Sequence, residues 1–231
     1  MNDRNPWRPD VTVHYAQTLD GRIATRIGQS QWIGGDASLK LAHRLRAEHD
    51  AVMVGVGTVL ADNPRLTVRL VPGQSPLRVV VDSTLRLPMA AHILADGDAR
   101  TLVATTSRAP ADRVEAVRQS GADLLVVEHD AGGHVDLTEL MRRLRLRGVG
   151  SVLLEGGRQL ITTAFRERLV DRLVVCVSPK VMGTGIEAVG DLGVDYLCDA
   201  LVFEDSAFLQ LEGDMIFDGR LAARDRISAE F

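Results

Sequence analysis

The chain has 231 residues, of which 45% are hydrophobic and 25% charged, and this length and balance suit one globular protein with a substantial core. Its net charge of −4 and its scattered basic residues argue against nucleic acid as a partner, and no apolar run approaches the length that spans a membrane. Two cysteines cannot form a disulfide framework and the N-terminus lacks the apolar core of a signal peptide, so we expect a cytoplasmic protein.

Strands and helices are predicted to alternate along most of the chain. The expected strands are 11–17, 51–56, 77–82, 101–105, 122–128, 151–155 and 173–178. The expected helices are 37–48 with Asp36 as N-cap, 110–120, one between Asp136 and Gly148 with Glu139 completing a capping box, and one after Gly157. An irregular polar loop is expected at 22–32. Such alternation is typical of a parallel sheet covered by helices.

Beyond the last of these strands the pattern changes to short β-like pieces at 200–204, 208–212 and 215–221. These predict antiparallel strands at one edge of the sheet. We therefore expect an α/β fold with a mainly parallel central sheet, flanking helices and an antiparallel C-terminal edge. It would form a single domain over 1–231, in which 1–10 is a flexible N-terminal extension.

The stretch 50–69 joins a buried strand to a polar loop. Its apolar first part ends in Gly55 and Gly57, and a loop that holds Thr58 and Asp62 follows. Open α/β sheets build ligand sites where strands end in this way, and glycines let a backbone approach a ligand closely. An ordinary strand and turn explains the stretch equally well, because two glycines without a third are a weak motif.

A second glycine turn, Glu155-Gly156-Gly157, ends a predicted strand and opens a predicted helix. The N–H groups and partial positive charge of a helix N-terminus favour phosphate. A tight turn without a ligand is the alternative. We favour binding, because the helix follows at once and Glu155 adds a carboxylate at the same edge.

The triplet Thr106-Ser107-Arg108 also follows a strand and precedes a helix. Two hydroxyl groups and a guanidinium suit a phosphate such as the 2′-phosphate of NADPH. Helix capping beside a solvated arginine is an equally good interpretation.

Four further side chains are candidates only as pairs. Ser30 and Trp32 share a loop, where an indole can pack on a planar ring while the hydroxyl makes a polar contact. Arg46 and Arg69 can clamp a phosphate if the fold brings them together. Taken alone, the sequence favours a core tryptophan and solvated arginines.

Metal and nucleophile chemistry find no support in the sequence. No H-x-x-x-H, H-x-E, C-x-x-C or G-x-S-x-G pattern occurs. The histidines are His14, His43, His49, His92, His129 and His134. A cofactor that supplies its own chemistry is therefore attractive.

Five segments together resemble the pyrimidine reductases of riboflavin biosynthesis. They are TLDGRIAT at 18–25, SQWIGG at 30–35, HRLRAEHDAVMVGVGTVLADNPRLTVR at 43–69, LLEGG at 153–157 and LVDRLVVCVSPKVMG at 169–183. The resemblance implies a dihydrofolate-reductase-like fold, NADPH as hydride donor and a homodimer. It implies cofactor contacts from Ala16, Trp32, Thr58, Asp62, Ser83, Gly156, Gly157, Arg158, Gln159 and Leu160. It implies substrate contacts from Ser30, Arg46, Leu66, Arg69 and Glu155.

The implied reaction reduces the ribosylamino side chain of 5-amino-6-(5-phosphoribosylamino)uracil, or of its undeaminated 2,5-diamino-pyrimidinone analogue, to the ribitylamino form. Glu155 or Asp62, directly or through water, is the candidate proton donor. The family's zinc deaminase motifs are missing from this sequence, so no deamination is expected. Two alternatives are a dihydrofolate or dihydropterin reductase on the same fold and a dinucleotide-binding module without catalysis.

Overall fold

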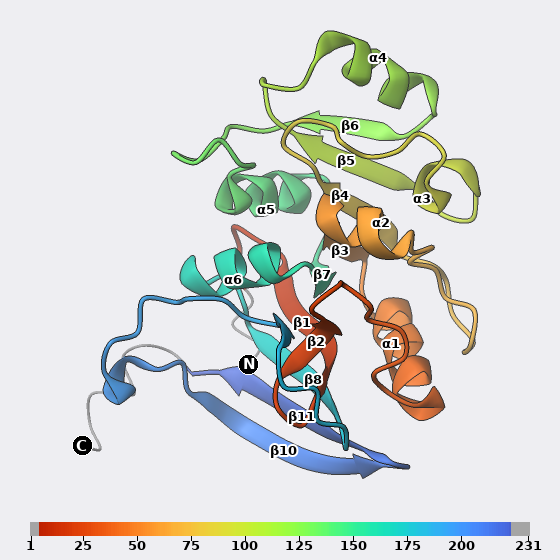
Figure 1. Ribbon diagram of the computed structural model, residues 1–231. Helices are drawn as coiled ribbons and strands as arrows, with labels where there is room; N and C mark the ends of the chain where they lie inside the picture. Colours follow the sequence, from red (N-terminus) through yellow and green to blue (C-terminus); the bar gives the residue numbers. More distant parts are fainter. Residues whose placement is uncertain (1–4, 223–231) are drawn as a thin grey trace.

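The strand β1 (Asp10–Thr18) lies inside the main sheet, paired in parallel with β7 (Ser151–Gly156) on one side and β8 (Arg172–Ser178) on the other (Figure 1). The computed structural model describes residues 5–222. Past β7 the parallel sheet continues through β3 (Ala51–Gly55), β4 (Leu77–Val81), β5 (Thr101–Thr105) and β6 (Asp123–Val126). Beside β8 lie the antiparallel strands β11 (Asp214–Leu221) and β10 (Phe203–Leu211). The predicted α/β fold with an antiparallel C-terminal edge is confirmed.

Helices cover both faces of this sheet because its strands are apolar on both sides. One face carries α5 (Leu137–Leu146) and α6 (Arg158–Arg166). The other carries α1 (Asp36–Glu48), α2 (Val56–Asp62), α3 (His92–Ala95) and α4 (Ala111–Gln119). A short 3-10 helix, η1 (Leu197–Asp199), precedes β10.

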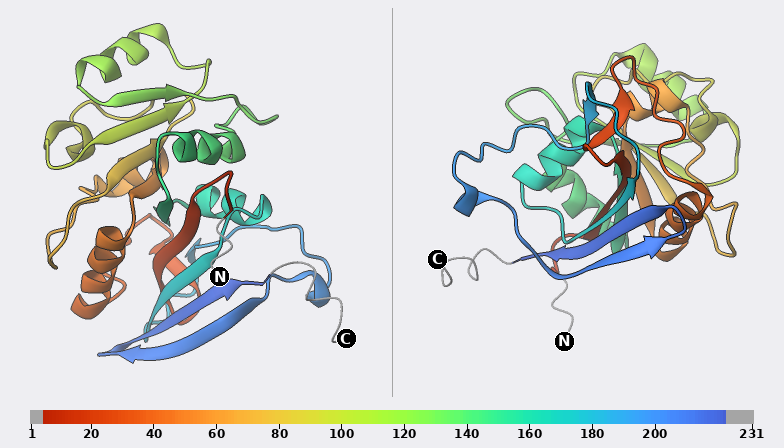
Figure 2. Two further views of the ribbon diagram at one scale, coloured as in Figure 1. Left: turned by 180° about the vertical axis from the view of Figure 1, so that it is seen from behind. Right: turned by 60° about the horizontal axis from the view of Figure 1, so that its bottom comes forward.

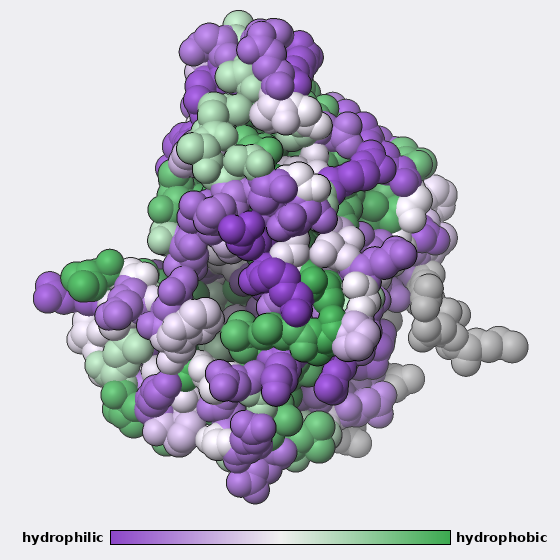
Figure 3. Space-filling model, turned by 90° about the vertical axis from the view of Figure 1, so that its right-hand side faces the viewer, coloured by the Kyte–Doolittle hydropathy of each residue, from purple (hydrophilic) through white to green (hydrophobic). Residues whose placement is uncertain are grey.

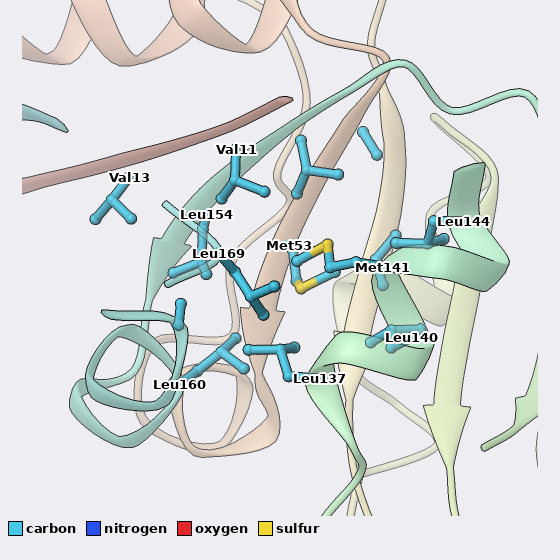
Figure 4. Packing of buried hydrophobic residues seen from close by; sticks show 14 of the residues in the cluster. Val11, Val13, Met53, Leu137, Leu140, Met141, Leu144, Leu154, Leu160 and Leu169 are labelled. Carbon is cyan, nitrogen blue, oxygen red and sulfur yellow. The ribbon is translucent and has the colours of Figure 1, made fainter. Parts of the chain in front are cut away.

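The α5 face of the sheet holds one of the two clusters of the hydrophobic core. Leu137, Leu140, Met141 and Leu144 recur at helical spacing and are buried, as the sequence predicted. Figure 4 shows Met53 of β3 facing Met141 across this layer. The helix begins where predicted, because the Asp136 carboxylate accepts the Glu139 N–H at 2.9 Å. The reciprocal bond of a capping box is not formed, since the Glu139 carboxylate binds Arg142 and Arg143 instead.

The antiparallel ribbon β10–β11 lies at one end of the molecule, and α4 with β6 lies at the other (Figure 2). Phe217 of β11 packs against Phe203 and Phe208 of β10, with ring centroids 5.6 and 5.2 Å apart. The predicted pieces 200–204 and 208–212 are therefore not separate strands, because one strand runs through both with a register shift between Glu204 and Ala207.

Two expected loops contain regular structure. The expected loop 22–32 begins with the strand β2 (Arg22–Thr25), which pairs with β9 (Gly185–Glu187), a partner far away in the sequence. The polar loop expected after Gly55 begins with α2 instead. Two buried valines, Val56 and Val59, anchor this helix to the sheet at helical spacing.

The starts of the chain and of α1 also differ from expectation. Arg8 forms an ion pair with Asp171 at 2.6 Å, so the part of the expected flexible extension next to β1 is anchored. Residues 1–4 lie outside the described range. Asp36 is the first residue of α1 rather than its N-cap. Gly35 is the N-cap, and its N–H donates to the Asp214 carboxylate at 2.8 Å.

Candidate active site

A cleft of about 1350 Å³ runs along the carboxyl ends of β1, β3, β4 and β7. In a parallel sheet these ends share one edge, where open α/β folds bind ligands. Most residues that the sequence analysis selected line this cleft. They are Ala16, Ser30, Trp32, Thr58, Asp62, Ser83, Arg108, Glu155, Gly156, Gly157, Arg158, Gln159 and Leu160.

The glycine turn after β7 has the geometry of an anion site. Gly157 is the N-cap of α6 with φ +89°, a left-handed conformation that side-chain-bearing residues rarely adopt. A Cβ on Gly156 or Gly157 would lie 3.3 or 3.4 Å from the Thr58 hydroxyl oxygen, so both glycines allow the turn to approach α2 closely. The first turn of α6 carries no acidic residue. Residues 157–160 line the cleft, so no acidic side chain within this turn competes with an anion bound at its N–H groups.

The loop before α1 forms the opposite wall of the cleft. The Ser30 hydroxyl donates to the Asp62 carboxylate at 2.9 Å, which ties this loop to α2. Trp32 is 68% exposed, so its indole is free to contact a ligand. The Lys180 ammonium group donates to the Trp32 and Ile33 carbonyl oxygens at 2.9 and 2.7 Å. The loop is thereby attached to α2 through Ser30 and to Lys180 through the Trp32 and Ile33 carbonyl groups.

A buried ion pair adjoins the cleft, which its Glu155 member lines. The Arg46 guanidinium donates two hydrogen bonds to the Glu155 carboxylate, both 2.6 Å. Burial alone would raise the pKa of Glu155, but the charge and hydrogen bonds of Arg46 bring it below its ordinary value. Glu155 is therefore an ionised partner of Arg46, and this state disfavours it as a proton donor.

Arg46 and Arg69 do come together, around Thr67. Arg46 donates to the Thr67 carbonyl oxygen at 3.2 Å, and the Arg69 guanidinium donates to the Thr67 hydroxyl. Since Glu155 offsets the charge of Arg46, Arg69 supplies the net positive charge of the group. The Arg69 N–H donates to His43 Nδ1 at 2.9 Å. Burial and the two arginines lower the pKa of His43 to about 4, so this ring is neutral near pH 7.

Five selected residues stand back from the cleft wall: Arg46, Leu66, Arg69, Thr106 and Ser107. Leu66 is buried in the core with φ +55°, so only its main chain is available to a ligand. The Thr106 hydroxyl donates to the Ser83 carbonyl oxygen at 2.8 Å and accepts the Arg108 N–H at 3.2 Å. Thr106 therefore shapes the turn, and Arg108 is the member of its triplet that faces the cleft.

His14 lines the cleft beside Glu155 but was not predicted as a site residue from the sequence. Its position follows from strand alternation. Val11, Val13 and Tyr15 pack on the α5 and α6 face, so His14 and Ala16 point to the opposite face. The available signal was the spacing of His14 and Ala16. His14 lies two positions before this predicted site residue on the same strand, so both side chains point to one face.

Neither a metal-binding cluster nor a membrane-spanning helix is found within residues 5–222. No group of three or more His, Cys, Asp and Glu side chains there is arranged to hold a metal ion. None of the helices in this range is long and apolar enough to cross a membrane. On the side of the molecule shown in Figure 3, hydrophobic residues occur in separate groups among hydrophilic ones.

Known proteins share both this sequence and this fold. The family model "RibD C-terminal domain" matches residues 9–217. A 2,5-diamino-6-ribosylamino-4(3H)-pyrimidinone 5′-phosphate reductase of Methanothermobacter thermautotrophicus is 41% identical over 217 residues, which cover 91% of this chain and 97% of the relative. The riboflavin biosynthesis protein RibD of Aquifex aeolicus is 35% identical over 210 residues, which cover 90% of this chain and 57% of the relative. This chain thus spans little more than half of that longer protein.

A solved structure gives the same result. The RibD of Acinetobacter baumannii superposes with a TM-score of 0.81 at 27% identity, covering 94% of this chain and 59% of that one. The family match covers most of the chain, and the relative of nearly equal length aligns almost from end to end. The resemblance stated from the sequence is confirmed, and the chain belongs to the RibD C-terminal domain family.

Proposed function

We propose that this chain is an NADPH-dependent reductase of riboflavin biosynthesis that acts in the cytoplasm. Its substrate would be 5-amino-6-(5-phosphoribosylamino)uracil or the undeaminated 2,5-diamino-pyrimidinone analogue, reduced at the ribosylamino side chain to the ribitylamino form. One observation carries the proposal. Consecutive residues of a single turn would serve two functions, because Glu155 contacts Arg46 while Gly156 and Gly157 lead into α6. A cofactor phosphate on α6 and a substrate at Glu155 would therefore lie side by side.

The residues of the cleft suit a dinucleotide. The N-terminus of α6 would hold the pyrophosphate, Thr58 of α2 lies beside that turn, and Asp62 of the same helix lines the cleft. The exposed indole of Trp32 would pack on a planar ring. When bound, the nicotinamide supplies a hydride to C1′ of the opened sugar. The protein's part is to hold C1′ at reacting distance in a site with few water molecules.

The test is NADPH oxidation with three substrates: the two aminopyrimidine phosphates and dihydrofolate. We expect turnover with at least one aminopyrimidine phosphate and none with dihydrofolate. The ratio of kcat/KM between the two pyrimidines identifies the natural one. Turnover of dihydrofolate alone would establish the pterin alternative. Tight NADPH binding without turnover of any of the three would establish a binding module.

Replacing Arg108 with alanine is expected to weaken NADPH about tenfold or more and to leave NADH nearly unchanged. The guanidinium faces the cleft, where the Gly133 carbonyl oxygen accepts from it at 3.2 Å, and one charge-assisted contact is worth about 1.5–3 kcal/mol. Titration of both cofactors by fluorescence measures the effect. Arg100→Ala is the control, because this arginine pairs with Asp123 on the surface and lies outside the cleft. Equal weakening of both cofactors would exclude Arg108 as the 2′-phosphate contact.

Replacing Arg69 with alanine is expected to raise KM for the phosphorylated pyrimidine about 10- to 100-fold, because one charge-assisted contact to the 5′-phosphate is lost. NADPH affinity should stay near that of the wild type. The dephosphorylated substrate should be poor for the wild type and lose little more in the variant. Arg65→Ala is the control, since Arg65 lies in the same loop but points to Asp96 and Asp98. A structural role for Arg69 would penalise both substrates equally.

We further propose that the protein is a dimer paired through its β10 edge. Phe208 and Leu209 of this strand and Met215 of β11 are exposed. An apolar edge of this kind needs a cover, and a second copy related by a two-fold axis is the commonest one. Sedimentation should give about twice 25.1 kDa at micromolar concentration. Leu209→Lys should give a monomer, whereas Leu146→Lys, at an exposed leucine of α5, should not. A monomeric wild type would refute the pairing.

A further inference from the structure

His14 is held in one tautomer by the strand next to it. Its Nδ1 lies 2.9 Å from the Val174 carbonyl oxygen of β8. A carbonyl oxygen only accepts, so Nδ1 carries the proton of the neutral ring. Nε2 then presents a lone pair. The ring cannot turn to exchange its two nitrogens without losing this hydrogen bond.

The free nitrogen of His14 opens onto the cleft. No described residue forms a hydrogen bond with Nε2, although the side chain is almost fully buried. Three buried side-chain atoms in the described chain are closed off from solvent and form no hydrogen bond: Asp82 Oδ1, Asp96 Oδ2 and Thr105 Oγ1. His14 Nε2 is not one of them. As His14 lines the cleft, a molecule bound there can reach this nitrogen.

The charges around His14 allow it to gain a proton and to give it up again. Burial lowers its pKa, so the resting ring is neutral. The Glu155 carboxylate on β7 opposes this by favouring the protonated ring, while Arg46 on α1 and Arg172 on β8 disfavour it. Both arginines are paired, with Glu155 and Asp218, so neither acts as an isolated charge. A proton on His14 is therefore tolerated for a short time beside Glu155.

We propose that His14 Nε2 carries a proton during the reduction, an inference that rests on the proposed function. As the C1′–O4′ bond breaks, Nε2 takes the proton of the exocyclic N–H, and the N–H electron pair forms the C=N bond of the imine. The O4′ oxygen keeps the C1′–O4′ pair and takes a proton from water. When hydride from the nicotinamide reaches C1′, the C=N pair returns to nitrogen, which takes the proton back from His14. One hydride and one solvent proton are consumed in all.

Three other ionisable groups in or beside the cleft, Glu155, Asp62 and His43, are less suited to this step. Glu155 already accepts two hydrogen bonds from Arg46, and Asp62 accepts one from Ser30. His43 is occupied too, because its Nδ1 accepts the Arg69 N–H and the residue does not line the cleft. His14 combines a fixed orientation, an unused lone pair and access to the cleft.

The test compares two histidine-to-asparagine variants. In His14→Asn the amide N–H2 can still donate to the Val174 carbonyl, so the variant removes Nε2 with little other change. In His43→Asn the amide oxygen can still accept the Arg69 N–H. We expect H14N to lower kcat about 100-fold, the low end for general acid–base catalysis, with KM and NADPH affinity changed less than about threefold. The wild type should lose kcat/KM as the pH falls below the lowered pKa of His14, because protonated His14 cannot accept a proton. H14N should lack this acid limb, and H43N should retain it.

A second variant guards against a purely structural explanation. His14→Ala should regain part of its kcat in added imidazole, and Ala16→Gly, a change on the same strand, should show no such rescue. The proposal is overturned if H14N keeps the wild-type kcat and acid limb, or if only its KM rises. If the wild type does not oxidise NADPH with either aminopyrimidine phosphate, the proposed function is refuted instead. The two failures are therefore distinguishable.

Discussion

Replacing Glu155 with alanine is expected to lower the free energy of unfolding by about 3–5 kcal/mol, because the Arg46 guanidinium is then buried without its charged partner. The two side chains are only 9% and 11% exposed, so water cannot replace the lost carboxylate. Urea unfolding at pH 7 measures the change. Asp123→Ala is the control, since it breaks the exposed pair with Arg100 and should cost no more than about 1 kcal/mol. Equal effects of the two variants would contradict the prediction.

The loss should depend on pH in a definite direction. The pKa of Glu155 lies below its ordinary value of 4.5, so its charge stabilises the folded state above that pH. This contribution disappears as the pH falls and the carboxylate is protonated in both states. The difference between the wild type and Glu155→Ala should therefore shrink in acid. A difference that stays constant from pH 7 to pH 3 would mean that the charge of Glu155 is not responsible.

A double variant separates stability from function at this pair. Arg46→Met with Glu155→Leu replaces the ion pair by apolar side chains of similar size, and such replacements are often neutral or stabilising. We expect most of the unfolding free energy to return while reductase activity does not. Recovery of both would make the pair a structural element only.

Replacing Gly157 with valine is expected to raise the Kd for NADPH about 100-fold, which corresponds to about 2.7 kcal/mol. Valine cannot easily adopt the φ of +89° at this N-cap, and its side chain would crowd Thr58. The N–H groups of α6 would then no longer face the cofactor phosphate. Isothermal titration with NADPH measures the change.

The control for this variant is another glycine of the same conformation. Gly148 has φ +84°, its Cβ position meets no atom within 4 Å, and it lies outside the cleft. Gly148→Val therefore imposes a similar backbone strain without touching the cofactor site. We expect it to lower the melting temperature and leave the NADPH Kd unchanged. If both variants weaken NADPH alike, the effect of Gly157→Val is general strain.

Features encoded by neighbouring residues were predictable from the sequence. The turn at Gly156 and Gly157 follows from a strand, two glycines and a helix in direct succession, and the structure places it as expected. The buried stripe of α5 likewise follows from helical spacing alone. Each of these depends on interactions within a few residues.

Features that depend on distant partners were not predictable. The β2 strand exists because β9 pairs with it, and nothing local in its sequence distinguishes it from a loop. Arg46 has no local sign that Glu155 will neutralise it, since the pair joins α1 to β7. The same holds for His14, whose tautomer is set by Val174 on a neighbouring strand. Charge and hydrogen-bond state are properties of the assembled site.

The place of β1 within the sheet has a consequence for how the chain is made. On the ribosome, β1 emerges before both of its neighbours, because β7 and β8 are translated much later. Until then its apolar residues have no native partner, and such unpaired strands promote aggregation. Contacts between remote parts of a chain also form slowly. The nascent protein is therefore expected to gain from chaperones during synthesis. A circular permutant that begins after β1 and carries β1 behind β11 should refold in a different order from the natural chain.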